Sequence, residues 1–339
     1  MNRPPAKKIL VREKSNIAPP LRLAAYAWFV AAFNLLVIMW GAYVRASASG
    51  DGCGAHWPLC NGEMIPASPL VKTLVEFAHR ATSGAALLLV VGLVAAAFRV
   101  CPKGHRVRRA AVAALVFIFC EALIGAALVK FGLVVADASA ARAVVMSLHL
   151  VNTFMLLGSL ALTAWWAGGG GAVRLRGQGS VGTLFLVALA CALSVAVSGA
   201  VNALGDTLFP ARTLAEGLRQ DLSPAAHFLL RLRVLHPAIA VVAGCYCVMV
   251  ASYTGNFLRP ARAVKKFTAV LATLFIAQVG LGVANVTLLA PVWLQLAHLL
   301  VADLFWIALV LCAAAALSDA AAEEACAAGA SLRRVAEQT

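Results

Sequence analysis

Long apolar stretches alternate with short polar segments along most of this chain of 339 residues. Each stretch has the length of about 20 residues that an α-helix needs to cross a bilayer core of about 30 Å. Lipid offers the backbone no hydrogen-bond partner, so a spanning segment of this length is expected to be helical. The pattern predicts eight spanning helices, at 22–44, 74–99, 109–131, 141–166, 180–203, 227–253, 264–288 and 291–317.

Composition supports a membrane protein and excludes an ordinary soluble one. Hydrophobic residues make up 62% of the chain and charged residues 12%, and the mean hydropathy is +0.89. The formal charge of +14 would suit a nucleic-acid partner, but Lys and Arg gather in the short gaps between apolar runs. That placement is typical of membrane topology control, so we expect no nucleic-acid binding.

The distribution of positive charge predicts the orientation. Of the 28 Lys and Arg residues, 19 fall in the two tails and in alternate gaps on one side. The positive-inside rule therefore places both termini in the cytoplasm and the segments 45–73 and 204–226 outside. The first 20 residues lack an apolar h-region, so they are interpreted as a cytoplasmic tail and not as a signal peptide. We expect a multi-pass protein of the bacterial inner membrane.

A run of four glycines at 168–171 marks the clearest internal boundary. The two flanking parts resemble each other, because a Gly-Ala pair lies near the end of the first and fifth spans and one His lies near the start of each even-numbered span. The expected fold is an all-α integral membrane protein of two pseudo-symmetric four-helix bundles. Its predicted parts are a cytoplasmic tail at 1–21, an N-terminal bundle at 22–166, a linker at 167–179, a C-terminal bundle at 180–317 and a cytoplasmic tail at 318–339.

Four of the seven histidines lie about two turns into an even-numbered span, on the outer side of the predicted bilayer. They are His79, His149, His236 and His298. Two imidazoles from facing helices at one depth suit the axial ligation of haem iron. A polar helix–helix contact is the alternative for any single one, but four at equivalent places favour a function, because buried polar groups are costly in lipid. Zinc is a weaker alternative.

Charged residues beside these histidines are further candidates. Arg80, Arg231 and Arg233 could bind haem propionates through paired hydrogen bonds, or they could be ordinary interfacial arginines. Glu76 lies one turn before His79 and shares its face, so it is a candidate proton acceptor unless it is a solvated surface carboxylate. Glu121 lies in the middle of the third span, where the second half has Gln278.

The outer segment 45–73 contains Cys53 and Cys60. Two cysteines in an oxidising compartment can form a structural disulfide, although free thiols and a redox-active pair remain alternatives. The other seven cysteines lie in spans or cytoplasmic segments, where thiols stay reduced.

These motifs together resemble the haem A synthase family. The resemblance rests on Arg45 through Asn61, Glu76 through Arg80, His149-Leu150, Leu235-His236-Pro237 and His298, and it covers about residues 22 to 317. Its departures are Gly54-Ala55-His56, where Pro-Asp commonly precedes Trp, and Glu121, where Gln is more usual.

The resemblance implies an enzyme that oxidises the C8 methyl group of haem O to a formyl group, giving haem A for terminal oxidases. It implies that His79 and His149 hold the substrate haem O, and that His236 and His298 hold a retained haem b. It further implies that Glu76 is the essential carboxylate and that Cys53 and Cys60 are bonded.

Two other functions remain open. A di-haem electron-transfer protein needs the same four histidines but has no need of Glu76, and a haem carrier would bind without chemistry. The expected partners are haem O, a haem O synthase, oxidase assembly factors and membrane lipid, with a homo-oligomer as a further expectation.

Overall fold

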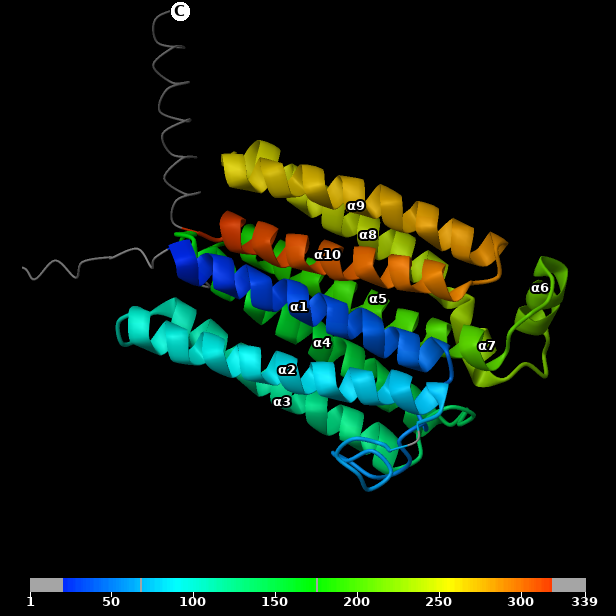
Figure 1. Cartoon of the computed structure of the whole chain (residues 1–339). Helices are drawn as coiled ribbons and strands as arrows, with labels where there is room; N and C mark the ends of the chain where they lie inside the picture. Colours follow the sequence, from blue (N-terminus) through cyan, green and yellow to red (C-terminus); the bar gives the residue numbers. More distant parts are fainter. Residues whose placement is uncertain (1–20, 68, 175, 319–339) are drawn as a thin grey trace, which may run out of the picture.

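Eight long helices lie side by side in a computed structural model that describes residues 21–67, 69–174 and 176–318. Short loops join helices that run in opposite directions (Figure 1). The elements are α1 (Leu21–Ala46), α2 (Val71–Val100), α3 (Arg106–Lys130), α4 (Ala140–Ala167), α5 (Ser180–Leu208), α6 (Leu214–Leu222), α7 (Phe228–Arg233), α8 (Leu235–Tyr253), η1 (Thr254–Leu258), α9 (Arg262–Thr287) and α10 (Val292–Ala316). Within the described residues there are isolated β-bridges but no strand. The all-α membrane fold is thus confirmed.

The predicted spans agree with the observed helices except for the sixth. The segment Phe228–Leu258 is apolar and long enough to cross a membrane, but it consists of α7, α8 and the π-helical turn η1. The chain re-enters a helix at Leu235, and Pro237 lies in the first turn of α8. Proline is tolerated there because the first backbone N–H groups of a helix have no partner within it.

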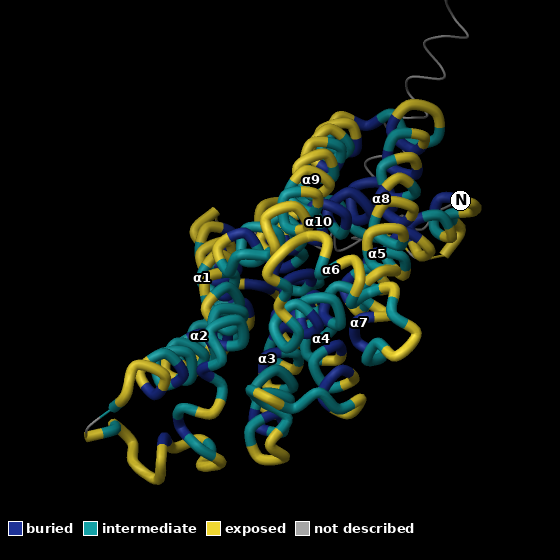
Figure 2. The backbone as a smooth tube through the Cα atoms, turned by 90° about the vertical axis from the view of Figure 1, so that its right-hand side faces the viewer, coloured by how far each residue is buried: buried dark blue, intermediate teal, exposed yellow. Residues whose placement is uncertain are grey.

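Helices α4 and α10 form the centre of the molecule and carry the longest runs of buried residues. Figure 2 shows the buried positions, in dark blue, gathered around α4, α5 and α10. One core cluster joins Phe154 of α4 to Trp306 of α10, whose Nε1 donates to the carbonyl of Phe154. A second cluster joins α1, α2, α3 and α4. Because α4 belongs to both clusters, it connects the two parts of the chain.

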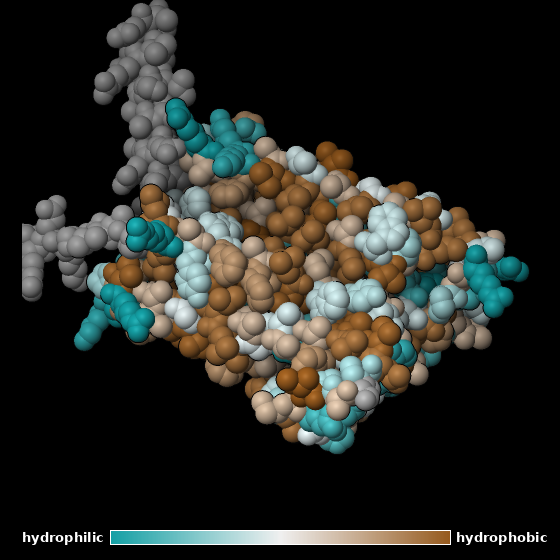
Figure 3. Space-filling model, in the orientation of Figure 1, coloured by the Kyte–Doolittle hydropathy of each residue, from teal (hydrophilic) through white to brown (hydrophobic). Residues whose placement is uncertain are grey.

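The outer surface of the helices is apolar over most of its length. Figure 3 shows hydrophobic side chains covering the middle of the visible face and polar ones gathered toward the ends. Exposed Leu36, Leu88, Leu186 and Val242 come from four different helices. This distribution is expected for helices in contact with lipid, and the chain is a multi-pass membrane protein.

The predicted linker follows the end of α4. Gly168 caps the helix and Gly169 adopts a φ of 90°, a conformation that favours glycine at a helix end. The two predicted bundles and their internal symmetry stay predictions. The predicted tails lie almost entirely outside the described residues.

Candidate functional site

One large cavity of about 1330 Å³ lies near the end of the bundle that carries the loops 47–70 and 209–227. Ligand pockets usually have a volume of about 300–1,000 Å³, so this cavity has room for more than one ordinary ligand. Residues from all ten α-helices of the described chain line it. The predicted histidines His79, His149, His236 and His298 all line this cavity.

The histidines form two neighbouring pairs. His79 lies close enough to His149 for the two imidazoles to interact electrostatically, and His298 lies equally within reach of His236. In each pair the two residues come from different helices, α2 with α4 and α8 with α10. The chain thus brings together the same pairs that the sequence pattern predicts.

Glycines on neighbouring helices make room for the imidazole rings. A Cβ atom on Gly41 would lie 2.8 Å from Cε1 of His79, and one on Gly199 would lie 3.2 Å from Cε1 of His236. A Cβ on Gly282 would lie 3.5 Å from Cε1 of His298. The ring of His79 needs glycine beside it, and a Cβ on Gly199 would push the ring of His236 by a few tenths of an ångström. These contacts give a reason for the Gly-Ala pairs at the ends of the first and fifth spans.

The imidazole nitrogens of the C-terminal pair face neutral groups. Nδ1 of His236 lies 2.9 Å from the hydroxyl of Ser198, and Nε2 of His298 lies 3.2 Å from Nε2 of Gln278. A hydrogen bond at Nδ1 fixes the ring and leaves Nε2 for iron, as is usual for a metal-binding histidine. His236 therefore has the arrangement of an iron ligand, whereas Nε2 of His298 would have to exchange its contact with Gln278 for iron.

The N-terminal pair differs because Glu121 stands at the position that corresponds to Gln278 in the second half of the chain. Oε1 of Glu121 lies 3.5 Å from Nδ1 of His149. The carboxylate of Glu121 also accepts hydrogen bonds of 2.5 Å from Oγ1 of Thr153 and Nδ2 of Asn152. Nδ1 of His79 and Nδ1 of His149 are buried without a hydrogen-bond partner within the described chain, so Nε2 is the ring nitrogen left to face the cavity in each residue. This pair also fits haem.

Glu76 is buried and fully engaged. Only 3% of the residue is exposed. Its Oε1 accepts from Arg80 at 2.5 Å (Nη2) and 3.1 Å (Nε), and its Oε2 accepts the backbone N–H of Cys53 at 2.8 Å. The interpretation of Glu76 as a solvated surface carboxylate is therefore wrong, because helix α2 and the 47–70 loop enclose it. It lies at the wall of the cavity.

The loop before α2 is held closed over the N-terminal part of the cavity. Cys53 and Cys60 are joined by a disulfide. Arg80 donates to the carbonyl oxygens of His56 and Leu59, both at 2.5 Å. The next residues of this loop, Trp57 and Pro58, line the cavity. The six described cysteines outside this loop are free thiols, and Cys326 lies outside the described residues.

The arginines predicted to bind propionates already have protein partners. Arg80 is paired with Glu76, and Arg233 binds Asp206 at 3.0 Å and also Asp221. Arg231 donates to the carbonyl of Pro224 and does not line the cavity. Their role toward a ligand stays a prediction.

Three charged residues inside spans are absent from the sequence-based prediction of the site. Arg45 and Arg142 line the cavity. Asp303 is fully buried, and neither of its carboxylate oxygens has a hydrogen-bond partner in the described part of the chain. Their common signal is a charge within an apolar stretch, which is costly in lipid and usually functional.

Fold and site together define a multi-pass membrane protein in which two histidine pairs share one cavity. Residues 24–310 match the profile of the cytochrome oxidase assembly protein family (COX15-CtaA), and the chain belongs to this family.

Individual relatives agree with this family. The chain is 53% identical over 300 residues to a protein of Thermus thermophilus named "Protoheme IX farnesyltransferase", a match that covers 88% of this chain and 49% of that protein. Proteins named "Heme A synthase" are 36% identical over 111 residues in Alkalihalophilus pseudofirmus and 41% identical over 98 residues in Halalkalibacterium halodurans. These two matches cover 33% and 29% of this chain, and 37% and 33% of the relatives. The chain thus spans about half the length of the Thermus proteins it matches.

Proposed function

We propose that this chain is a haem A synthase, an oxidoreductase that converts the C8 methyl group of haem O into a formyl group. The observation that carries the proposal is that His79, His149, His236 and His298, from four helices, line one cavity together with Glu76. The family and the names of partial relatives support the same function.

We assign the two histidine pairs different roles. His79 and His149 would hold the substrate haem O, and His236 and His298 would hold a resident haem b. Haem b would supply an iron centre through which electrons leave the site. The neutral surroundings of the second pair, made by Ser198 and Gln278, suit a ligand that stays bound and does not react.

Glu76 is the residue we expect to take protons in the reaction. Oxidation of a methyl group by water to an aldehyde releases protons and electrons in equal numbers, so a base must lie near the reacting carbon. The carboxylate of Glu76 lies one helical turn from His79 and at the cavity wall. Arg80 keeps this carboxylate in place, and the closed loop limits the access of bulk water.

The names of the two Thermus relatives raise farnesyl transfer as a second candidate. These proteins are about twice as long as the matched region, so we assign the farnesyl transfer to the half that this chain does not match. A farnesylated haem is the product of such a transfer, and it is the substrate class that we propose here. A haem O synthase is therefore the expected partner, beside oxidase assembly factors and further copies of this chain.

Co-expression with a haem O synthase tests the proposal. Cells that contain both proteins are expected to accumulate haem A, as measured by mass analysis of extracted haem. A di-haem electron-transfer protein or a haem carrier would leave haem O unchanged. A farnesyltransferase would produce haem O from haem b without the co-expressed enzyme.

A further inference from the structure

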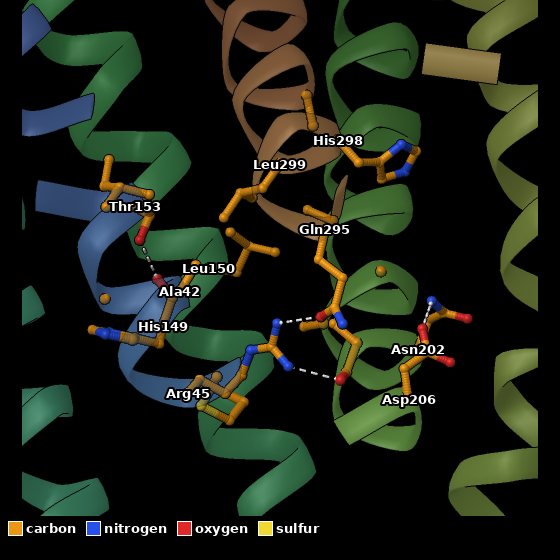
Figure 4. A pocket seen from close by; sticks show the side chains of 18 of the residues that line it. Ala42, Arg45, His149, Leu150, Thr153, Asn202, Asp206, Gln295, His298 and Leu299 are labelled. Carbon is orange, nitrogen blue, oxygen red and sulfur yellow. Dashed lines mark hydrogen bonds between the residues drawn. The ribbon is translucent and has the colours of Figure 1, made fainter. Parts of the chain in front are cut away.

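Arg45 reaches from α1 across the cavity to the second half of the chain. Its Nη1 donates to the carbonyl of Ala203 at 2.8 Å and to Oγ1 of Thr207 at 2.5 Å. Its Nη2 donates to Oε1 of Gln295 at 3.0 Å, and Figure 4 shows Arg45 directed toward this residue. All of these acceptors are neutral, so no carboxylate among the described residues hydrogen-bonds to this guanidinium group.

Arg142 is a second cation of the same kind. It is only 3% exposed and lines the cavity. Its Nη1 donates to the carbonyl oxygens of Val135 at 2.9 Å and Asp137 at 2.7 Å. Its Nε is buried and has no hydrogen-bond partner within the described residues. Nε itself is sealed within the protein, so the part of Arg142 that lines the cavity is what an anion there could contact.

The nearby acids are engaged elsewhere. Asp206 acts on Arg45 through its charge, but its hydrogen bonds go to Arg233 and Asn202. The carboxylate of Asp137 accepts from the backbone and the hydroxyl of Ser139. Arg45 and Arg142 also repel each other, because Arg142 is among the charges that act on Arg45. Asp206 and Asp137 act on Arg45 and Arg142 through their charges, but neither carboxylate hydrogen-bonds to these guanidinium groups, so a ligand carboxylate would make their first direct ion pairs within the described residues.

The sequence positions of both arginines place them beside the first histidine pair. Arg142 precedes His149 by two turns on α4, so the two residues lie on one face of that helix. Arg45 follows Gly41 by about one turn on α1, and Gly41 packs against the ring of His79. Both arginines therefore lie nearer to the outer ends of their helices than the two histidines do.

We propose that Arg45 and Arg142 bind the carboxylate groups of the haem that His79 and His149 hold, an inference that rests on the proposed function. Arg80, the residue that the sequence indicates for this role, is occupied by Glu76 and by two loop carbonyls. Planar guanidinium groups bind carboxylates through paired hydrogen bonds, and a macrocycle held at its iron by histidines would be fixed in rotation by this second contact.

Haem binding without turnover tests this inference. Purified full-length protein is titrated with iron protoporphyrin IX and with its dimethyl ester, in which both carboxylates are blocked. Binding at the first pair is measured as the part of the absorbance change that the wild type shows and the His149→Ala variant does not. We expect the wild type to bind the ester roughly ten- to a hundredfold more weakly than the acid, as for lost charge-assisted hydrogen bonds.

Variants then show which residues cause the preference for the acid over the dimethyl ester. Arg45→Gln is expected to bind the acid almost as weakly as the ester, whereas Arg219→Gln, which changes an exposed outer arginine, should keep the full preference. Arg142 also binds loop carbonyls, so Arg142→Lys is used to keep the positive charge. It should retain part of the preference, because an ammonium lacks the planar fork.

Two results would overturn the inference: equal affinity of the wild type for acid and ester, or an unchanged preference in Arg45→Gln. If the arginines bind a lipid phosphate instead, the preference is absent and haem affinity changes when phosphatidylglycerol replaces phosphatidylcholine. The proposed function fails separately, since a protein that prefers the acid but makes no haem A would refute only the enzyme assignment.

Discussion

The imidazole of His79 packs against the backbone of Gly41, where a Cβ atom would lie 2.8 Å from Cε1 of the ring. Gly41→Ala is therefore expected to displace His79 and to weaken haem binding at the first pair by roughly tenfold, the effect of moderate overpacking. Spectral titration of the purified variant measures this affinity.

Gly280→Ala is the matched control for this change. Gly280 is also helical, but it does not line the cavity, and a Cβ there meets nothing within 4 Å. Haem affinity should stay unchanged, and the helix should gain about 0.5–1 kcal/mol. Equal losses in the two variants would show that the ring contact is unimportant.

Glu76→Gln is expected to carry haem yet to accumulate haem O, with haem A formation reduced about 100-fold or more, as for the loss of a general base. Extracted haem from the co-expressing cells measures this loss. The change also removes the charge that pairs with Arg80, so thermal stability is expected to fall.

Glu63→Gln is the control for the possibility that Glu76 acts only by holding the loop in place. Glu63 accepts the backbone N–H of Ala67 in the same loop but is exposed. It should keep wild-type turnover. Haem A formation at the wild-type rate in a folded Glu76→Gln protein would refute the catalytic role of Glu76.

The two histidine pairs should respond differently to substitution. His236→Ala and His298→Ala are expected to lose the retained b-type haem, whereas His79→Ala and His149→Ala keep it and lose turnover. Pyridine haemochrome spectra quantify the retained haem in each purified variant. The division of roles would be wrong if all four variants lost the same fraction.

The disulfide between Cys53 and Cys60 should stabilise the loop over the cavity. Closing so short a loop contributes about 2–3 kcal/mol in the chain-entropy model. Cys53→Ser is expected to lower the temperature of thermal inactivation and the haem affinity of the first pair. Mass analysis of unreduced wild-type protein should find this pair bonded, and two free thiols would contradict the prediction.

Labelling from outside the membrane tests the proposed orientation. A cysteine placed at Arg219, on exposed α6, should react with an impermeant thiol reagent. A cysteine at Lys266, near the start of α9, should not react because the positive-inside rule places it in the cytoplasm. The opposite pattern would reverse the topology.

The spanning helices could be predicted because their length and apolarity are local properties of the sequence. The predicted 141–166 and the observed α4 (Ala140–Ala167) differ by one residue at each end. Helix α6 is absent from the prediction although Thr213 and Glu216 form a recognisable helix start, with Thr213 accepting the N–H of Glu216 and Glu216 that of Arg212.

The candidate site was only partly predictable for a physical reason. The regular spacing of the histidines relative to the spans identifies them without any tertiary information. The contact of Arg45 with Gln295 joins positions 250 residues apart and depends on how α1 packs beside α10. Sequence periodicity contains no information of that kind, so Arg45 and Arg142 could be noticed as charges in spans but not assigned to a ligand.

If both histidine pairs bind haem as proposed, the shared cavity would link the two sites thermodynamically. Arg45 belongs to α1 and yet is held by groups on α5 and α10, so a ligand that orders it at one pair also orders the wall of the other. Linkage is reciprocal: if haem b raises the affinity for haem O, haem O raises the affinity for haem b by the same factor. Any conformational entropy that this common wall loses on binding would be lost once, with the first haem to bind. A protein loaded with its resident haem would then capture each new substrate molecule more tightly than the empty protein does.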